Sequence, residues 1–347
     1  MFSRPALIGP FILIISLTVG YPIFWFFAAL TGESLVNTWI EKRHLQGIEV
    51  SHEKINYSGF PFLIRVTLKS PEVRSSANRL IFTSQSVSLE YRPWNFNTLR
   101  IEANGSQKLS NIINNFSQNV TMKTKSIESV LKFGDDEQLT TASIVAKGIR
   151  VVDTHRGILL ETKNLYTDIE FPDRPPLTYK ETAFRLKAFL KDIVLPKLEV
   201  PLFGKTIDSI RIKADFLGPV TIYAFPETLH AWRQAGGTLE LSRLRLVWKA
   251  LDMRANGTLA LDKGMRPIGA LTADIRGFDE ALSALADAGL IRPKMLPASR
   301  VTLNLLAKTD ENDGRRVLTV PMTAQNGAFF VGPIKLTNLP AIVANPH

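Results

Sequence analysis

The chain has 347 residues, which is enough to bury one large hydrophobic core or two modest ones. A hydrophobic content of 45% excludes an intrinsically disordered chain, and the absence of cysteine excludes disulfides, thiolate metal sites and cysteine nucleophiles. The net charge of +10 comes largely from basic residues that are spread singly along alternating apolar stretches, as at Arg243, Arg245 and Arg254. This spacing is typical of a solvated strand face and argues against a nucleic-acid-binding protein.

Residues 5–30 contain no charged side chain. As a helix this segment would be about 39 Å long, which exceeds the ~30 Å hydrocarbon thickness of a bilayer. Tyr21 and Trp25 fit an interfacial aromatic belt. A cleaved signal peptide is the alternative, but its apolar core would be too long and the residues that follow match a cleavage site poorly. We therefore predict that residues 1–32 are an uncleaved transmembrane anchor.

The residues after this anchor predict how the chain leaves the membrane. Leu35, Trp39 and Leu45 recur at near-helical spacing and residue 47 is a glycine, so residues 32–47 are predicted to form a short helix. No second apolar span follows. We expect a single-pass protein with the bulk of the chain outside the cytoplasm.

From residue 60 onward the hydrophobic period changes to two, which is typical of half-buried strands with one wet face. Four stretches alternate in this way, at residues 60–68, 87–91, 184–190 and 210–216. The sequence therefore predicts a mainly β fold (β-rich α+β), in which the anchor is followed by one or more curved antiparallel sheets.

Two segments interrupt the strand pattern. Residues 226–237 begin with proline and end with Gly-Gly, and residues 279–290 carry acidic residues in their first turn, so both predict short helices. The polar residues 104–135 fit either a further helix or a long loop. The proline-rich residues 172–176 suggest two β-rich halves, 33–171 and 177–347, although these halves could also form one continuous domain.

Residues 99–106 (LRIEANGS) and 251–258 (LDMRANGT) echo each other, and each follows an alternating run that ends near an aromatic residue. A fainter third copy lies at residues 318–331. Repeated two-strand units of this kind suit a meander in which Asn-Gly supplies the positive φ of tight turns or bulges. Coincidence between short strand patterns is the alternative.

No set of residues has the spacing of a catalytic, cofactor or metal site. Residues 204–206 read Gly-Lys-Thr, but Glu199 stands where a phosphate-binding loop needs glycine. Residues 310–314 fit a charged hairpin turn better than a calcium loop, and the five histidines never pair at helical spacing. We expect no enzyme activity, cofactor or metal; only a cleft that gathers Ser, His or carboxylate side chains from distant segments would favour an enzyme.

Alternation places several apolar side chains on one face of a sheet, where a concave surface could shelter an acyl chain. These residues fit a plain hydrophobic core equally well. The candidate ligand face consists of Phe60, Phe62, Ile64, Val66, Leu68, Leu251, Met253, Leu259 and Leu261.

With residues 58–73, 236–248, 255–277 and 326–340 in view, the chain resembles the domain of unknown function 2125 family of bacterial proteins. The Gly-Phe-Pro-Phe segment at residue 59 and the segment beginning Gly-Thr-Leu-Ala-Leu-Asp at residue 257 are the more specific parts. The family has no established activity or catalytic residues to carry over. The recurrent Gly-Thr-Leu units also resemble, more loosely, the AsmA-type envelope proteins, whose sheets curl into a lipid-conducting groove.

The predicted anchor, the alternating strands and the family resemblance together predict a protein of the bacterial inner membrane whose bulk lies in the periplasm. We expect it to act by binding a lipid or other apolar ligand on a sheet face. The alternative is a structural or interaction scaffold of the cell envelope, with a filled interior and a protein partner. No nucleic-acid partner is expected.

Overall fold

The computed structural model describes the chain except for residues 1–19, 46, 76–79, 114–115, 197–202, 221–226, 290, 312 and 344–347. The chain divides into two compact units, each built mainly of antiparallel strands, so the predicted mainly β fold is confirmed. Unit 1 comprises Met1–Gln138 with Asp153–His155, and unit 2 comprises Leu139–Val152 with Arg156–His347. Residues 172–176 lie inside unit 2, and the predicted division at this point stays a prediction.

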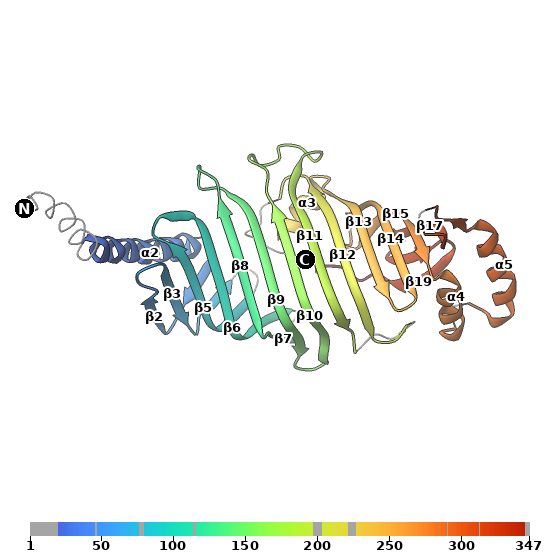
Figure 1. Cartoon of the computed structure of the whole chain (residues 1–347), viewed down its shortest axis with the longest axis horizontal. Helices are drawn as coiled ribbons and strands as arrows, with labels where there is room; N and C mark the ends of the chain where they lie inside the picture. Colours follow the sequence, from blue (N-terminus) through green and yellow to red (C-terminus); the bar gives the residue numbers. More distant parts are fainter. Residues whose placement is uncertain are drawn as a thin grey trace, which may run out of the picture. The chain divides into compact units, whose positions relative to one another are not determined.

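The described residues of unit 1 form one long helix and eight strands (Figure 1). Strand β5 is the centre of its sheet, because it pairs with β3, β4 and β6, and β6 in turn pairs with β7 and β8. The elements are α2 (Tyr21–His44), β1 (Ile48–Ser51), β2 (Lys54–Ser58), β3 (Ile64–Lys69), β4 (Glu72–Ser75), β5 (Leu80–Arg92), β6 (Asn95–Ile113), β7 (Phe116–Lys123) and β8 (Ser126–Phe133).

The core of unit 1 lies between α2 and the sheet. Ala28 and Ala29 of α2 pack against Ile64 and Val66 of β3, and all four side chains are buried. Alanine on the helix lets its backbone approach the sheet closely, while the branched β3 side chains fill the space. Unit 1 is therefore a sheet with a helix on one face.

Unit 2 is a meander of long strands that run side by side (Figure 1). Strands β10 to β15 pair with their neighbours in chain order, and β15 then pairs with β17. The strands are β9 (Leu139–Asp153), β10 (Gly157–Glu170), β11 (Thr182–Val194), β12 (Thr206–Leu217), β13 (Thr238–Trp248), β14 (Leu251–Leu261), β15 (Pro267–Arg276), β16 (Lys308–Thr309), β17 (Arg316–Gln325), β18 (Ala328–Val331) and β19 (Ile334–Asn338). The helices are α3 (Glu227–Gln234), α4 (Phe278–Asp287), the 3₁₀ turn η2 (Pro293–Met295) and α5 (Leu296–Leu306).

Several predicted elements are present. Helices α3 and α4 lie within one residue of the predicted starts at 226 and 279, and the predicted helix at 32–47 is the second half of α2. Where the structure describes them, the polar residues 104–135 form neither a helix nor a long loop but parts of β6, β7 and β8. In the sequence, the many Asn and Ser residues of this stretch obscure the two-residue hydrophobic period of a strand. Pairing with neighbouring strands nevertheless places the stretch in the sheet.

The prediction that Phe60 and Phe62 belong to a strand is wrong. Both lie in the connection between β2 and β3, and the alternation continues as a strand only from Ile64. Gly59 has a φ of +104°, and a Cβ there would lie 2.6 Å from the Leu63 carbonyl oxygen, so the chain turns sharply. Pro61 adds to this, because it has no N–H to donate to a ladder.

The Asn-Gly pairs of the repeat occupy two kinds of position. Asn326 and Gly327 have φ of +52° and +68° and form the two-residue turn between β17 and β18. Gly105 instead lies inside β6, beside a register shift in β5, and Gly257 lies inside β14, beside a register shift in β13. The repeat therefore marks one hairpin turn and two strand irregularities.

Residues 1–19 of the predicted anchor lie outside the described residues. From Tyr21 onward its residues belong to α2. Among the residues that the structure describes, no helix is both long enough and apolar enough to cross a membrane.

Candidate apolar ligand face

The register of unit 2 aligns uncharged residues in three continuous rows across seven strands, from β10 to β15 and on to β17, and all of them are apolar except Thr167. Cross-strand partners share one face of a sheet, so each row is read directly from the pairing. The first row is Leu165, Leu190, Ile210, Leu246, Met253, Ile275 and Leu318; the second is Thr167, Ala188, Ile212, Leu244, Ala255, Ala273 and Val320; the third is Ile169, Leu186, Ala214, Leu241, Gly257, Leu271 and Met322. We call this surface the apolar face.

The side chains of the apolar face are unevenly buried. On β14, β15 and β17 the small or flexible ones are fully buried, among them Ala255, Ala273 and Met322. Leu244 and Leu246 on β13 and Ile212 on β12 are only partly buried, although they pack against the same cluster. The large side chains near the middle of the face therefore retain surface that an apolar molecule could cover.

Aromatic residues close the two ends of the apolar face. At one end Trp248 packs edge-on against Phe203, with ring centroids 5.6 Å apart, and its indole Nε1 donates to the Gly204 carbonyl at 3.1 Å. At the other end Trp232 of α3 lies beside Phe216, and its Nε1 donates to the Leu217 carbonyl at 2.7 Å. The partly buried middle thus lies between two packed borders.

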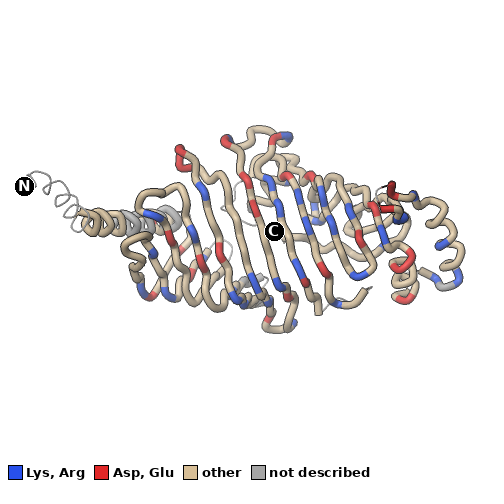
Figure 2. Tube along the Cα trace, in the orientation of Figure 1, with Lys and Arg blue, Asp and Glu red and all other residues tan. Residues whose placement is uncertain are grey.

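The opposite face of the same strands is charged. Figure 2 shows basic and acidic positions along β10 to β15, and the register sets them across from one another. Arg245 forms a two-bond pair with Asp252 at 2.8 and 2.9 Å, and these hydrogen bonds lower the pKa of the Asp252 carboxyl. Lys187 likewise lowers the pKa of Glu170 through a hydrogen bond. The charged side of the sheet therefore faces water, and the apolar side chains lie on the opposite side.

Two glycines explain why β14 and β15 can meet so closely within the apolar face. Gly257 and Gly269 both have a φ of +151°. A Cβ on Gly257 would lie 2.3 Å from the Ala270 carbonyl oxygen, and one on Gly269 would lie 2.2 Å from that of Thr258. Only glycine fits at either position. This is the structural reason for the Gly-Thr-Leu and Gly-Ala-Leu segments in the sequence.

A side-chain turn fixes the register of the β14–β15 hairpin. Asp262 Oδ1 accepts hydrogen bonds from the backbone N–H groups of Gly264 and Arg266 at 2.8 and 2.9 Å. The Arg266 guanidinium pairs with the other carboxylate oxygen. Because a slip of one residue would turn every apolar side chain of β14 to the charged face, this turn helps to keep the apolar face apolar.

Four of the predicted ligand-face residues belong to this surface. Met253 is a member of the first row, and Leu251, Leu259 and Leu261 point to the same side of β14 because they lie an even number of residues away from it. Leu251 lies at the end of the apolar face that Trp248 and Phe203 close, and it packs with Trp248. The four predicted residues of β14 therefore share one side of the sheet, and their role as a ligand face stays a prediction.

The other predicted ligand-face residues lie in unit 1, some on strand β3 and some in the connection before it. Ile64 and Val66 are 0% and 1% exposed beneath α2, and Leu68 follows them on β3. Phe60 and Phe62 are exposed in the connection between β2 and β3. This set does not form one continuous surface, because α2 covers its strand portion and the chain turns before it.

Sequence reasoning missed the residues of β11, β12 and β13 that complete the apolar face, above all Ile212, Leu244 and Leu246. The alternating pattern of these strands was visible, but no local signal told which strands pair or in which register. Cross-strand pairing joins residues as far apart in the sequence as Leu165 and Leu318, and only the folded sheet reveals it.

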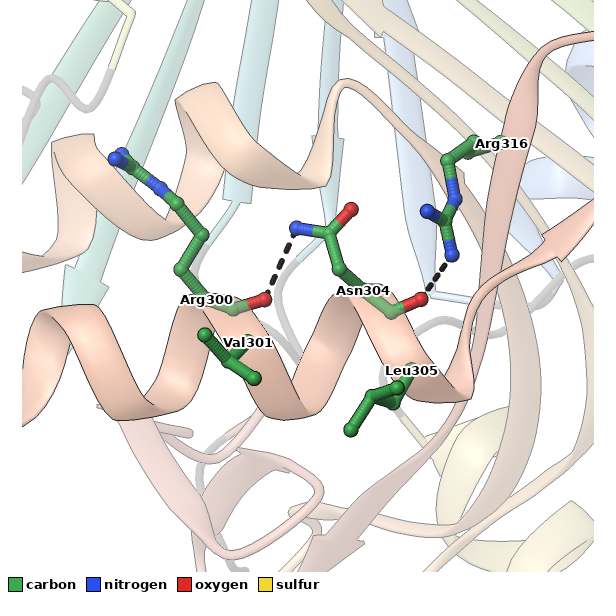
Figure 3. Close-up of a pocket in the computed structure, with 5 residues that line it drawn as sticks. All are labelled: Arg300, Val301, Asn304, Leu305 and Arg316. Atoms are coloured by element: carbon green, nitrogen blue, oxygen red, sulfur yellow. Dashed lines mark hydrogen bonds between the residues drawn. The ribbon is translucent and has the colours of Figure 1, made fainter.

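Helix α5 presents a smaller feature that the sequence did not predict. Asn304 donates to the Arg300 carbonyl at 2.9 Å, and the Arg316 guanidinium donates to the carbonyl of Asn304 (Figure 3). Val301 and Leu305 lie along the other side of the helix, and Leu305 is 82% exposed. These five residues line a shallow, open pocket. In the part of the chain that the structure describes, no group of three or more metal-binding side chains gathers anywhere.

Comparison with known proteins places the chain in a family. A family model described as "Uncharacterized protein conserved in bacteria (DUF2125)" matches residues 25–340. The match begins within α2, ends two residues after β19 and includes the whole apolar face. No curated protein and no solved structure matches the chain. Since the matched span covers most of the sequence, the chain belongs to the bacterial DUF2125 family.

Proposed function

We propose that this chain is a membrane-anchored periplasmic protein of bacteria that acts by binding, and that it holds a lipid or another apolar ligand on the apolar face of unit 2. The observation that carries the proposal is the set of three apolar rows, which cross seven strands without a charged side chain. The large side chains in the middle of these rows, among them Ile212, Leu244 and Leu246, are only partly buried, and apolar surface that stays in contact with water favours a ligand or partner.

The size of the face suits a long hydrocarbon chain. Six spacings of about 4.8 Å between neighbouring strands give a row length of about 29 Å. At ~0.8 kcal/mol per buried CH₂ group, an acyl tail along one row could gain on the order of 10 kcal/mol before ordering costs. The face shows no charged group along its rows, so the hydrocarbon part of a ligand would supply most of the affinity.

Location and orientation are proposed from the sequence. The uncharged residues 5–30 support a membrane anchor, and the absence of a second such stretch supports a single crossing. The looser resemblance to AsmA-type envelope proteins supports a lipid ligand by analogy only.

Photo-crosslinking tests the proposed ligand face. A photoreactive residue replaces Leu244 in the full chain, which is purified from membranes and irradiated, and the adducts are identified by mass spectrometry. The matched control carries the same residue at Arg243, which is adjacent on β13 but lies on the charged face. We expect lipid adducts at residue 244 and not at residue 243. Equal labelling at both sites, or none at either, would refute the proposal.

The exposed apolar side chains of α5 favour a second function. Val301, Leu305 and Leu306 are exposed on this helix, and a scaffold protein of the envelope could use them to hold a protein partner. Lipid adducts at residue 244 would support the first function, while adducts to another protein at residue 305 without any lipid at residue 244 would support the second.

A further inference from the structure

Exposed aromatic side chains gather at one end of the sheet of unit 1. Ile64 pairs with Tyr91 and Arg92 pairs with Asn95, so the β2–β3 connection lies beside the β5–β6 turn. Helix α2 reaches the same end, because Trp25 packs edge-on against Phe60 at 5.6 Å between ring centroids. Phe24 lies beside Tyr21, whose ring also packs against Phe60. We call the following exposed residues the aromatic rim: Phe24, Phe60, Phe62, Trp94 and Phe96.

Hydrogen bonds fix α2 against this end of the sheet. The Trp25 indole Nε1 donates to the Leu63 carbonyl at 3.0 Å, and the Tyr21 hydroxyl donates to the Pro61 carbonyl. The Tyr91 hydroxyl donates to the Ala28 carbonyl at 2.9 Å. These hydrogen bonds hold α2 beside the β2–β3 connection and the end of β5 within unit 1.

This packing limits how far a lipid bilayer can extend along the helix. Ala28 and Ala29 are buried against Ile64 and Val66, so these two residues contact protein and cannot contact lipid. A membrane crossing by the uncharged segment would therefore have to be completed before Ala28. Residues 5–22 would already span about 27 Å as a helix, close to the ~30 Å hydrocarbon thickness. The bilayer surface would then lie at the level of the aromatic rim.

We propose that the aromatic rim of unit 1 inserts into the headgroup region of the bilayer that holds the anchor, so that unit 1 rests directly on the membrane. This inference relies on the anchoring stated under the proposed function. Trp prefers the membrane interface, where its ring leaves water and its N–H stays hydrated, and Phe accompanies Trp on protein surfaces that insert into the headgroup region. Phe62 is 73% exposed and Trp94 is 57% exposed, which is costly for large apolar side chains in water.

The chain connects the aromatic rim directly to the predicted membrane crossing, which favours a bilayer over a protein partner as what the rim contacts. Residues 21–27 belong both to the uncharged segment and to α2, so the rim begins where the predicted membrane crossing ends. Two separate strand connections bring their aromatic residues to this same level. An anchored unit would keep this surface near lipid permanently, which raises its effective concentration there.

Depth-dependent quenching tests the proposal in the full chain. The natural sequence lacks cysteine, so Phe62→Cys and Trp94→Cys each accept one environment-sensitive fluorophore without other changes. The labelled protein is reconstituted into vesicles of phosphatidylethanolamine and phosphatidylglycerol that contain a lipid-attached quencher. The control is Glu53→Cys, an exposed position at the opposite end of β2.

We expect at least threefold stronger quenching at residues 62 and 94 than at residue 53, together with blue-shifted emission at the two rim sites. Protein that floats with the vesicles but shows equal quenching at all three sites would overturn the aromatic rim and leave the anchoring intact. Failure to float would overturn both. Protection of the rim from water-soluble quencher only at high protein concentration, without lipid quenching, would assign it to a second copy of the chain instead.

Discussion

The sheets of the two units carry similar alternating strands but differ in what covers their apolar sides. In unit 1, β3 lies beneath α2, and Ile64 and Val66 have almost no accessible surface. In unit 2, β13 carries Leu244 and Leu246 on an equally apolar side, yet both are only partly buried. The same local pattern thus serves as a closed core in one unit and as a candidate binding surface in the other.

This difference arises from the elements next to the strands rather than from the strands themselves. A helix with paired alanines can approach a sheet and cover it, as α2 does. Among the described residues of unit 2, Trp232 of α3 and Phe203 pack at the ends of the apolar face, where Trp232 and Trp248 are buried. A binding surface can therefore form where the covering elements stop short of the middle.

The largest expected effect comes from placing a charge under α2. Val66→Asp buries an unpaired carboxylate, so we expect a loss of more than about 4 kcal/mol in the stability of unit 1. Leu244→Asp places the same charge on a partly exposed site of unit 2, where we expect a loss of about 1–2 kcal/mol. Hydrogen–deuterium exchange of the backbone amides of β3 and β13 measures both losses of stability. Equal losses would contradict the distinction between a covered and an open face.

A smaller effect is expected at the close approach of β14 and β15. Gly257→Ala sets a methyl group against the Ala270 carbonyl oxygen in a backbone conformation that only glycine tolerates, and should cost about 3 kcal/mol. Gly332→Ala is the matched control, because it has a φ of +55° but no atom within 4 Å of the added Cβ, and should cost about 1 kcal/mol. Thermal unfolding followed by circular dichroism compares them. The glycine explanation fails if the control is as destabilising as Gly257→Ala.

The smallest expected effect concerns the charged face. Arg245 lowers the pKa of Asp252 in the folded state, so folding favours the carboxylate. The pair should add up to about 1 kcal/mol of stability above the usual carboxyl pKa of about 3.9, and this contribution should vanish as the pH falls through the lower folded-state pKa. Urea unfolding of Asp252→Asn at pH 7 and at pH 3 measures the change.

Asp192→Asn is the control for this pH series, since Asp192 lies 3.8 Å from Lys163 and both side chains are largely exposed. We expect no measurable change in that variant at either pH. A destabilisation by Asp252→Asn that stays the same at both pH values would show that the ion pair is not its cause.

The strands of the apolar face illustrate how far sequence reasoning reaches. The alternation at residues 184–190 and 210–216 predicted β11 and β12, and the predicted residues on β14 proved to share one side of the sheet. Ile212 and Leu244 were not identified as neighbours, because their pairing depends on a register that a bulge at β13 adjusts. The helix α5 was missed as well, because its apolar residues do not lie on one face: Leu303 packs against the α4 cluster, while Val301 and Leu305 are exposed.

Hydrophobic period, turn residues and composition alone specified the fold class, the two faces of strands such as β11 and β12, and the helices α3 and α4, because each of these depends on residues close together in the chain. The register of the seven strands, the burial of Ile64 beneath α2 and the partial burial of Leu244 were decided only in the folded protein. These features depend on contacts between segments that are distant in sequence. Whether an apolar strand face becomes a core or a binding surface is set by what packs upon it, and a strand's own residues do not encode that neighbour.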